Sequence, residues 1–203
     1  GKCTFAIEIG QDLWAPVPPS SFHVLQGAQV IANLSADREL LMREQYRNNL
    51  LKQHSAKSLC GYVYASAGFG ESTQDNVYSG SASIWESGQK LAANERYSMG
   101  ASLITADIDY ERIEGFRRKA AGFYNVSPTG TDASSYYRSY NRANIGDPNN
   151  TDFEKELCRY VEPHPFVPES DLDYRCQEIL SMQTVALATR LNHIRCRSAV
   201  IGI

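Results

Sequence analysis

Long apolar runs and a strong net charge are both absent from this sequence, and each absence excludes a class of protein. No stretch of the 203 residues approaches the roughly 20 consecutive apolar residues that a membrane-spanning helix needs. The formal net charge of −3 gives no support to a nucleic acid or an anionic membrane as a partner. The first ten residues also lack the long apolar stretch of a signal peptide, and we therefore expect a cytoplasmic location.

Metal-ligand and disulfide spacings are absent as well. The four histidines are scattered, and the glycine-rich stretch 68–73, GFGEST, matches neither a P-loop nor a dinucleotide fingerprint, so we interpret it as a turn. No metal or cofactor is therefore expected in this sequence. The five cysteines form no C-x-x-C pair, which is typical of a reducing compartment, and structural thiols are expected at Cys3, Cys60, Cys158, Cys176 and Cys196.

About the first 115 residues alternate apolar runs with an amphipathic segment, which predicts an α/β fold. Within residues 37–60, Met42, Tyr46 and Leu50 recur four residues apart and predict the apolar stripe of a helix of about 20 residues. Residues 102–113 are predicted to be a strand that runs into a helix. Further strands are predicted at residues 4–9, 29–35 and 61–68 and in a hairpin about Ser87-Gly88.

The second half of the sequence changes character twice. Residues 122–169 are rich in Gly, Asn, Ser and Tyr, and we interpret them as a linker. A long helix is predicted from Ser170, its candidate N-cap, and residues 198–203 are predicted to form a new strand. The chain thus divides into residues 1–121, 122–169 and 170–203. The long helix carries one apolar stripe, formed by Leu172, Cys176, Ile179, Leu180, Leu187, Leu191 and Ile194.

Several stretches, in their order and spacing, resemble one known family. Four stretches resemble the second half of a nitrilase-superfamily domain: EIGQDLWAPVPPSS, VIANLSA, YVYASAGFGESTQD and SGSASIWESGQKLA. More specifically, they resemble the amide-hydrolysing domain of the glutamine-dependent NAD+ synthetases. That family's entry into its ATP-using domain is resembled by PFVPES, QEILSMQTVALATRL and SAVIGI. The resemblance implies a partial nitrilase-like α-β-β-α sandwich, followed by a linker, a long helix and the first strand of a synthetase domain.

The resemblance also implies a reaction. In that family a cysteine thiolate attacks the side-chain amide of glutamine, a Glu shuttles the proton, a Lys stabilises the oxyanion, and water cleaves the thioester. The ammonia aminates an adenylylated nicotinate adenine dinucleotide in the synthetase domain, which uses ATP and Mg²⁺. The loop for the ATP pyrophosphate would follow Ile203, and the family's Glu and Lys would precede Gly1, so we expect none of these groups within this sequence.

Gly10 stands where the resemblance places the nucleophilic cysteine, and Gln11 replaces the acidic residue after it. Glycine supplies no thiolate, so we predict that this chain does not hydrolyse glutamine. Glu8 or Asp12 would be able to activate a water but offers no covalent route. Cys3 is about 20 Å away along the same strand and cannot reach the site.

The resemblance places Gln11 and three further residues in the glutamine pocket. Arg43 is expected to pair with the carboxylate of glutamine, because its guanidinium can bind a carboxylate bidentately. Asp37 either accepts the α-ammonium group or caps the helix that follows it. Trp14 either walls the pocket or fills the core.

Two functional readings follow from these residues. The first is a segment of a glutamine-dependent NAD+ synthetase with a disabled glutaminase site, and the alternative is a non-catalytic pseudo-glutaminase that acts as a scaffold or interaction domain. Another nitrilase-type amidase is disfavoured by the linker and long helix. With half a sandwich, the chain is expected to expose a sheet edge and an apolar face, and hence to be poorly stable alone or to associate with like chains.

Overall fold

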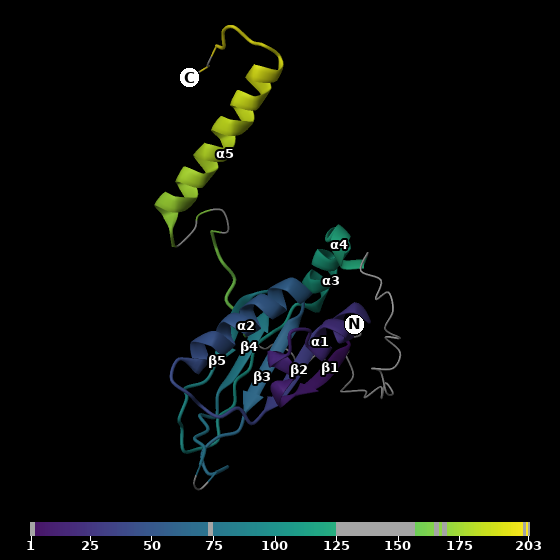
Figure 1. Cartoon of the computed structure of the whole chain (residues 1–203), viewed down its shortest axis with the longest axis vertical. Coiled ribbons are helices and arrows are strands. Elements are labelled where there is room, and N and C mark those ends of the chain that lie inside the picture. Colours follow the sequence, from purple (N-terminus) through teal and green to yellow (C-terminus); the bar gives the residue numbers. More distant parts are fainter. Residues whose placement is uncertain are drawn as a thin grey trace. The chain divides into compact units, whose positions relative to one another are not determined.

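The computed structural model describes residues 3–72, 75–124, 157–164, 167, 170–200 and 202. The chain forms two compact units, Gly1–Arg159 and Tyr160–Ile203 (Figure 1). The first unit contains a sheet and its helices, and the second contains one long helix. In the part of the chain that is described, no helix is both long enough and apolar enough to cross a membrane.

A five-stranded sheet in the order β1-β2-β3-β4-β5 organises the first unit. The first three strands are parallel, and the last two continue the sheet in antiparallel pairing. The strands predicted at residues 4–9, 29–35 and 61–68 and the hairpin about Ser87-Gly88 are therefore confirmed. The strands are β1 (Phe5–Ile9), β2 (Val30–Ser35), β3 (Gly61–Ser66), β4 (Ala82–Glu86) and β5 (Gln89–Ala93).

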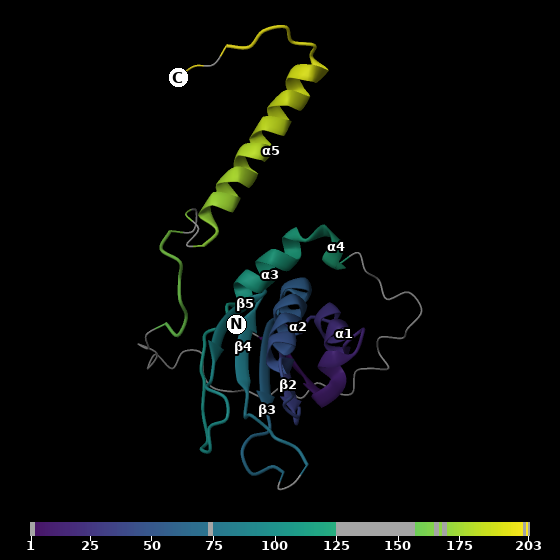
Figure 2. The same cartoon turned by 60° about the vertical axis from the view of Figure 1, so that its left-hand side comes forward.

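Helices α1 (Pro19–Leu25) and α2 (Arg43–Ser58) pack against this sheet (Figure 2). A short 3-10 helix, η1 (Gly10–Trp14), connects β1 to the segment that leads into α1. Farther along the chain, α3 (Tyr110–Lys119) is followed by the single turn α4 (Ala121–Tyr124).

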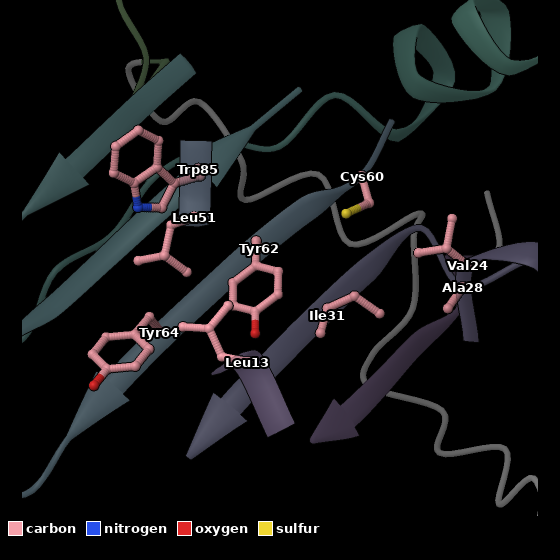
Figure 3. Packing of buried hydrophobic residues seen from close by; sticks show 9 residues of the cluster. All are labelled: Leu13, Val24, Ala28, Ile31, Leu51, Cys60, Tyr62, Tyr64 and Trp85. Carbon is pink, nitrogen blue, oxygen red and sulfur yellow. The ribbon is translucent and has the colours of Figure 1, made fainter. Parts of the chain in front are cut away.

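The core lies between the sheet and the helices. Tyr62 and Tyr64 of β3 project from the same face of the sheet as Ile31 of β2, and all three are fully buried (Figure 3). Burial of a large apolar side chain stabilises the fold by about 1.5–3 kcal/mol. The cluster is completed by Leu13, Val24, Ala28, Leu51, Cys60 and Trp85.

Helix α2 buries a different face from the one that the sequence predicts. Met42 and Tyr46 are 66% and 60% exposed, whereas Arg47 and Leu51 are fully buried. The apolar stripe misleads here because the buried face carries an arginine that is neutralised by ion pairs, and its charge hides the face from a hydrophobicity pattern. The helix is also shorter than predicted, since it begins at Arg43.

The strand predicted at the start of residues 102–113 does not form. Residues 101–109 are irregular, and Ile108 lies against Gly61 of β3, where a Cβ would approach its side chain to 3.0 Å. This segment thus packs on a strand instead of pairing with one. Asp109 ends it by capping α3, since its carboxylate accepts a hydrogen bond from the backbone N–H of Arg112 at 2.8 Å.

The second unit contains the predicted long helix, α5 (Leu172–His193). Its N-cap is Asp171 in a left-handed conformation, not Ser170, and no side-chain capping bond forms. None of its residues is buried, so its apolar stripe is open within this unit. Residues 198–200 are not a strand, because a strand needs a hydrogen-bonded neighbour and this unit's described residues offer none. Residues 201 and 203 lie outside the described residues.

The sheet face opposite α1 and α2 is open over β1 and β2. Phe5, Ile7 and Ile9 of β1 are 54%, 51% and 66% exposed, and Leu34 of β2 is 56% exposed. Isolated surface apolar residues are normal, but a row of four on adjacent strands forms a contiguous patch. The exposed apolar face predicted from the sequence is confirmed.

Residues 157–159 fall inside the predicted linker, but they form hydrogen bonds with other residues of the first unit. Arg159 donates two hydrogen bonds of 3.1 Å to the buried carboxylate of Glu86 in β4. The backbone N–H of Asp107 donates to the carbonyl oxygen of Cys158 at 3.1 Å, and the backbone N–H of Cys158 donates to Oδ2 of Asp107 at 2.5 Å. The rest of the predicted linker is described only at residues 122–124, 160–164 and 167.

Candidate functional site

The candidate site lies where the parallel strands end. Ile9, Ser35 and Ser66 are the last residues of β1, β2 and β3, and all three line one open pocket of about 540 Å³. Ligands of α/β proteins bind outside the carboxyl ends of parallel strands, because the loops that follow the strands converge there. The remaining lining residues are Gly10, Gln11, Leu34, Ala36 and Ala65.

Gly10 forms the turn between β1 and η1. Its φ is +57°, in the left-handed region, and a Cβ built on it would meet no atom within 4 Å. Asp12 closes the turn, since its Oδ2 accepts a hydrogen bond of 2.9 Å from the backbone N–H of Ile9. A side chain at position 10 would therefore enter open space, at a conformational cost of about 1–2 kcal/mol for a residue other than glycine.

Glu8 lies two residues before this turn and is 2% exposed. Its Oε1 accepts a hydrogen bond from the Tyr62 hydroxyl and one of 3.5 Å from the Asn33 amide, and its Oε2 accepts from the backbone N–H of Ser20 at 3.0 Å. Burial and the nearby Glu8 charge raise the pKa of Tyr62, so the phenol keeps its proton and remains a donor. Glu8 thus links β1 to α1, β2 and β3 and holds the strand that presents Gly10.

Glu8→Gln is expected to lower the free energy of unfolding by about 1–3 kcal/mol. The amide has one acceptor oxygen, so one of the donors that face Glu8 is left unsatisfied in a buried place. Urea unfolding monitored by fluorescence measures this loss. Glu111→Gln, an exposed acidic residue of α3, is the matched control and should change the unfolding midpoint little. A Glu8→Gln midpoint equal to that of the control would contradict the supporting role.

A second, more polar pocket of about 450 Å³ adjoins the first, and Gln11 lines both. All its lining residues except Ala36 can form hydrogen bonds, so it suits a small polar ligand. It is lined by Gln11, Ala36, Asp37, Arg38, Arg43, Asn76 and Tyr78.

Asp37 and Arg43 are joined to each other in this pocket. Arg43 donates from Nε and Nη2 to Asp37 at 2.7–3.1 Å, and this hydrogen-bonded carboxylate raises the pKa of Arg43. Asp37 is 2% exposed and also faces Arg47 at 3.4 Å. The capping role considered for Asp37 is wrong, because α2 begins six residues later with Met42 as its N-cap. Asp37 instead holds two arginines.

Trp14 contacts the pocket indirectly. The guanidinium carbon of Arg43 lies 4.1 Å from the centroid of its ring, and the Tyr46 ring stacks on it at 5.6 Å with an interplanar angle of 9°. Trp14 also packs against the core cluster and lines neither pocket. Stacking and the bonds to Asp37 together fix the orientation of Arg43.

The sequence reasoning missed three hydrogen-bonding residues that line the polar pocket, namely Arg38, Asn76 and Tyr78. Asn76 and Tyr78 lie on the long β3–β4 connection, and no periodic pattern indicates that this connection folds back to the ends of the parallel strands. One feature of the sequence could have indicated Arg38: it directly follows Asp37, a predicted pocket residue, in the loop after β2.

Neither Cys3 nor Cys60 lines the pocket beside Gly10. Cys60 is fully buried, and burial raises the pKa of its thiol to about 12, so it is protonated at neutral pH. Cys3 precedes β1 at the opposite end from Gly10, and burial also raises its pKa. A reactive thiol must form its thiolate in an accessible place.

No group of three or more His, Cys, Asp or Glu side chains among the described residues is arranged to hold a metal ion. The turn interpretation of residues 68–73 agrees with the structure over 68–72, which join β3 to the irregular segment before β4. Thr73 lies outside the described residues.

Comparison with curated proteins identifies glutamine-dependent NAD(+) synthetases as relatives of this chain. The glutamine-dependent NAD(+) synthetase of Mycobacterium tuberculosis is 36% identical over 199 residues, which cover 97% of this chain and 29% of that protein. The Mycobacterium leprae protein of the same name is 35% identical over 206 residues, with the same coverage. The chain therefore spans less than a third of the length of these curated relatives. No protein-family model matches it.

Among solved structures, a carbon-nitrogen hydrolase from Helicobacter pylori G27 superposes with a TM-score of 0.50, covering 60% of this chain and 45% of that one. The sequence identity is 17%, so this likeness bears on the fold alone. The predicted nitrilase-like α/β fold is confirmed. The resemblance seen in the sequence is also confirmed, since this chain is homologous over nearly its whole length to a segment of the glutamine-dependent NAD+ synthetases.

Proposed function

From this homology to a segment of the glutamine-dependent NAD+ synthetases, we propose that the chain is part of such a synthetase and that its glutamine-hydrolysing site is disabled. The whole protein would take glutamine and nicotinate adenine dinucleotide as substrates. ATP and Mg²⁺ would be used by a synthetase domain, and we propose no ATP-binding or Mg²⁺-binding residue among the described residues of this chain.

The observation that carries the proposal is the position of Gly10. It follows a parallel strand, lies at a tight turn with positive φ and lines an open pocket. This is the geometry in which a strand-to-helix turn presents a nucleophile to a ligand. Glycine has no atom that can attack the amide carbon, so the thioester route is closed.

The nearby carboxylates do not supply an alternative route. Glu8 is buried and accepts its hydrogen bonds from the fold, and Asp12 closes the turn through the backbone of Ile9. Neither lines the pockets. Their contacts support structural roles for both.

The pocket beside Gly10 retains groups that favour binding without hydrolysis. Gln11, Asn76 and Tyr78 offer neutral hydrogen-bonding groups, and Arg38 offers positive charge. This supports the second candidate function, a non-catalytic domain that binds its ligand or serves as a scaffold. Association with like chains through the open face of β1 and β2 stays a prediction.

The test is the nitrogen source of NAD+ synthesis by the whole gene product that carries this sequence. With ATP, Mg²⁺ and nicotinate adenine dinucleotide, we expect NAD+ to form from ammonium and not from glutamine. Equal rates with the two nitrogen sources would contradict the disabled site. A gene product that forms no NAD+ from ammonium would contradict membership of a working synthetase and leave the scaffold function.

A further inference from the structure

Among the arginines that line the polar pocket, Arg38 takes no part in the ion pairs of the described residues. Three arginines and three carboxylates pair with one another at 2.7–3.6 Å, and their formal charges cancel. These residues are Arg43, Arg47, Arg96, Asp37, Glu39 and Glu44. Arg38 also lines the pocket and is exposed, and it makes no ion pair or hydrogen bond with the residues that the structure describes.

Arg43, which the resemblance predicts to bind the carboxylate of glutamine, already pairs with the carboxylate of Asp37. Its Nε and Nη2 donate three hydrogen bonds to Asp37, and its guanidinium lies on the ring of Trp14. A ligand that took over this arginine would weaken its pairing with a buried Asp37, which costs free energy because a buried carboxylate needs its partners. A ligand that paired with Arg38 would break no contact.

The other lining groups narrow the chemistry of the ligand. Gln11 and Asn76 can each donate to and accept from an amide, and Tyr78 offers a hydroxyl. Asp37 has both oxygens engaged by Arg43 and Arg47, so it is poorly placed to receive an ammonium group. A carboxylate bound by Arg38, with the neutral polar groups of Gln11 and Asn76 nearby, fits this lining.

We propose that Arg38, and not Arg43, binds the α-carboxylate of an α-amino acid with a side-chain amide in this pocket and so determines the pocket's specificity. Arg43 then acts as a fixed wall that Asp37 and Trp14 hold in place. The inference rests on the proposed function, because that function makes glutamine the ligand.

The test compares two ligands that differ only at the carboxylate. L-Glutamine and L-glutaminol, in which the carboxylate is a hydroxymethyl group, are titrated into the purified chain by nuclear magnetic resonance. The parent chain is expected to bind glutamine about tenfold or more tightly than glutaminol, as a charge-assisted hydrogen bond provides. Arg38→Gln should reduce this ratio to near one, and Arg38→Lys should restore part of it.

Arg118→Gln is the matched control, because it removes the same charge from an exposed arginine of α3 outside the pocket. It should keep the parent ratio. The proposal is overturned if the parent chain does not bind glutamine, if Arg38→Gln keeps the parent ratio, or if Arg43→Gln abolishes the ratio while Arg38→Gln does not. Ammonia release is a separate readout, so a chain that hydrolysed glutamine through an Arg38-dependent pocket would refute the disabled site and not this assignment.

Discussion

With saturating L-glutamine, the purified chain is expected to release ammonia about 10⁶-fold more slowly than a glutaminase with an intact cysteine nucleophile, since removal of a covalent nucleophile costs about that factor in a serine protease. Gly10 has no attacking atom, the thiol of Cys60 is buried and protonated, and Cys3 lies at the opposite end of β1. The measurement is ammonia formed per chain, followed by a coupled dehydrogenase assay.

The heat-denatured chain is the control for spontaneous deamidation and for contaminating enzymes. Its ammonia release should equal that of the native chain. A native rate near one turnover per second, in the usual range of enzymes, would show that another group performs the attack and would refute the disabled site.

Arg47→Met is expected to lower the free energy of unfolding by about 3–5 kcal/mol, the usual cost of removing one partner from a buried ion pair. Arg47 is fully buried, faces Asp37 at 3.4 Å and donates to Glu39 at 3.0 Å. Methionine fills much of the same space but leaves these carboxylates with fewer partners. Urea unfolding gives the change in midpoint.

Arg118→Met makes the same exchange at an exposed position of α3 and should shift stability by less than about 0.5 kcal/mol. If Arg47→Met matched this control, the ion pairs around Asp37 would not stabilise the fold. The orientation of Arg43 would then need another explanation, because it depends on the same carboxylate.

The sheet was predictable because its strands carry local signals. The runs at β1, β2 and β3 are rich in apolar and β-branched residues, and glycine and polar residues bound them. The hairpin followed from Ser87-Gly88, where Gly88 has a φ of +91° that other residues rarely adopt.

The packing of α2 was not predictable in the same way. Apolar periodicity favoured Met42 and Tyr46, but Tyr46 stacks on Trp14 and the helix buries Arg47. A buried arginine is compatible with the core only through partners that come from a separate loop. Those partners are Asp37 and Glu39. They lie outside the helix, so the apolar periodicity of the helix does not predict that they contact its buried face.

The candidate site likewise contains residues that the sequence predicted and contacts that it did not predict. Gly10 and Gln11 were found because a contiguous motif contains them, and the structure places both on the lining of a pocket. The pairing of Asp37 with Arg43 and the position of Arg38 depend on the path of the loop after β2. The resemblance placed Asp37 and Arg43 in the pocket but did not show that Asp37 forms an ion pair with Arg43.

The most direct test of the central claim is alkylation by 6-diazo-5-oxo-L-norleucine, a glutamine analogue that modifies thiols in glutamine-binding sites. The parent chain and its Gly10→Cys variant are treated with and without excess glutamine, and the modified peptides are mapped by mass spectrometry. We predict glutamine-protected labelling at position 10 in the variant and none in this peptide of the parent, because a side chain at position 10 enters the open pocket. An unlabelled position 10 in the variant, or a protected label on this peptide of the parent, would contradict the claim that Gly10 stands where the nucleophile is needed.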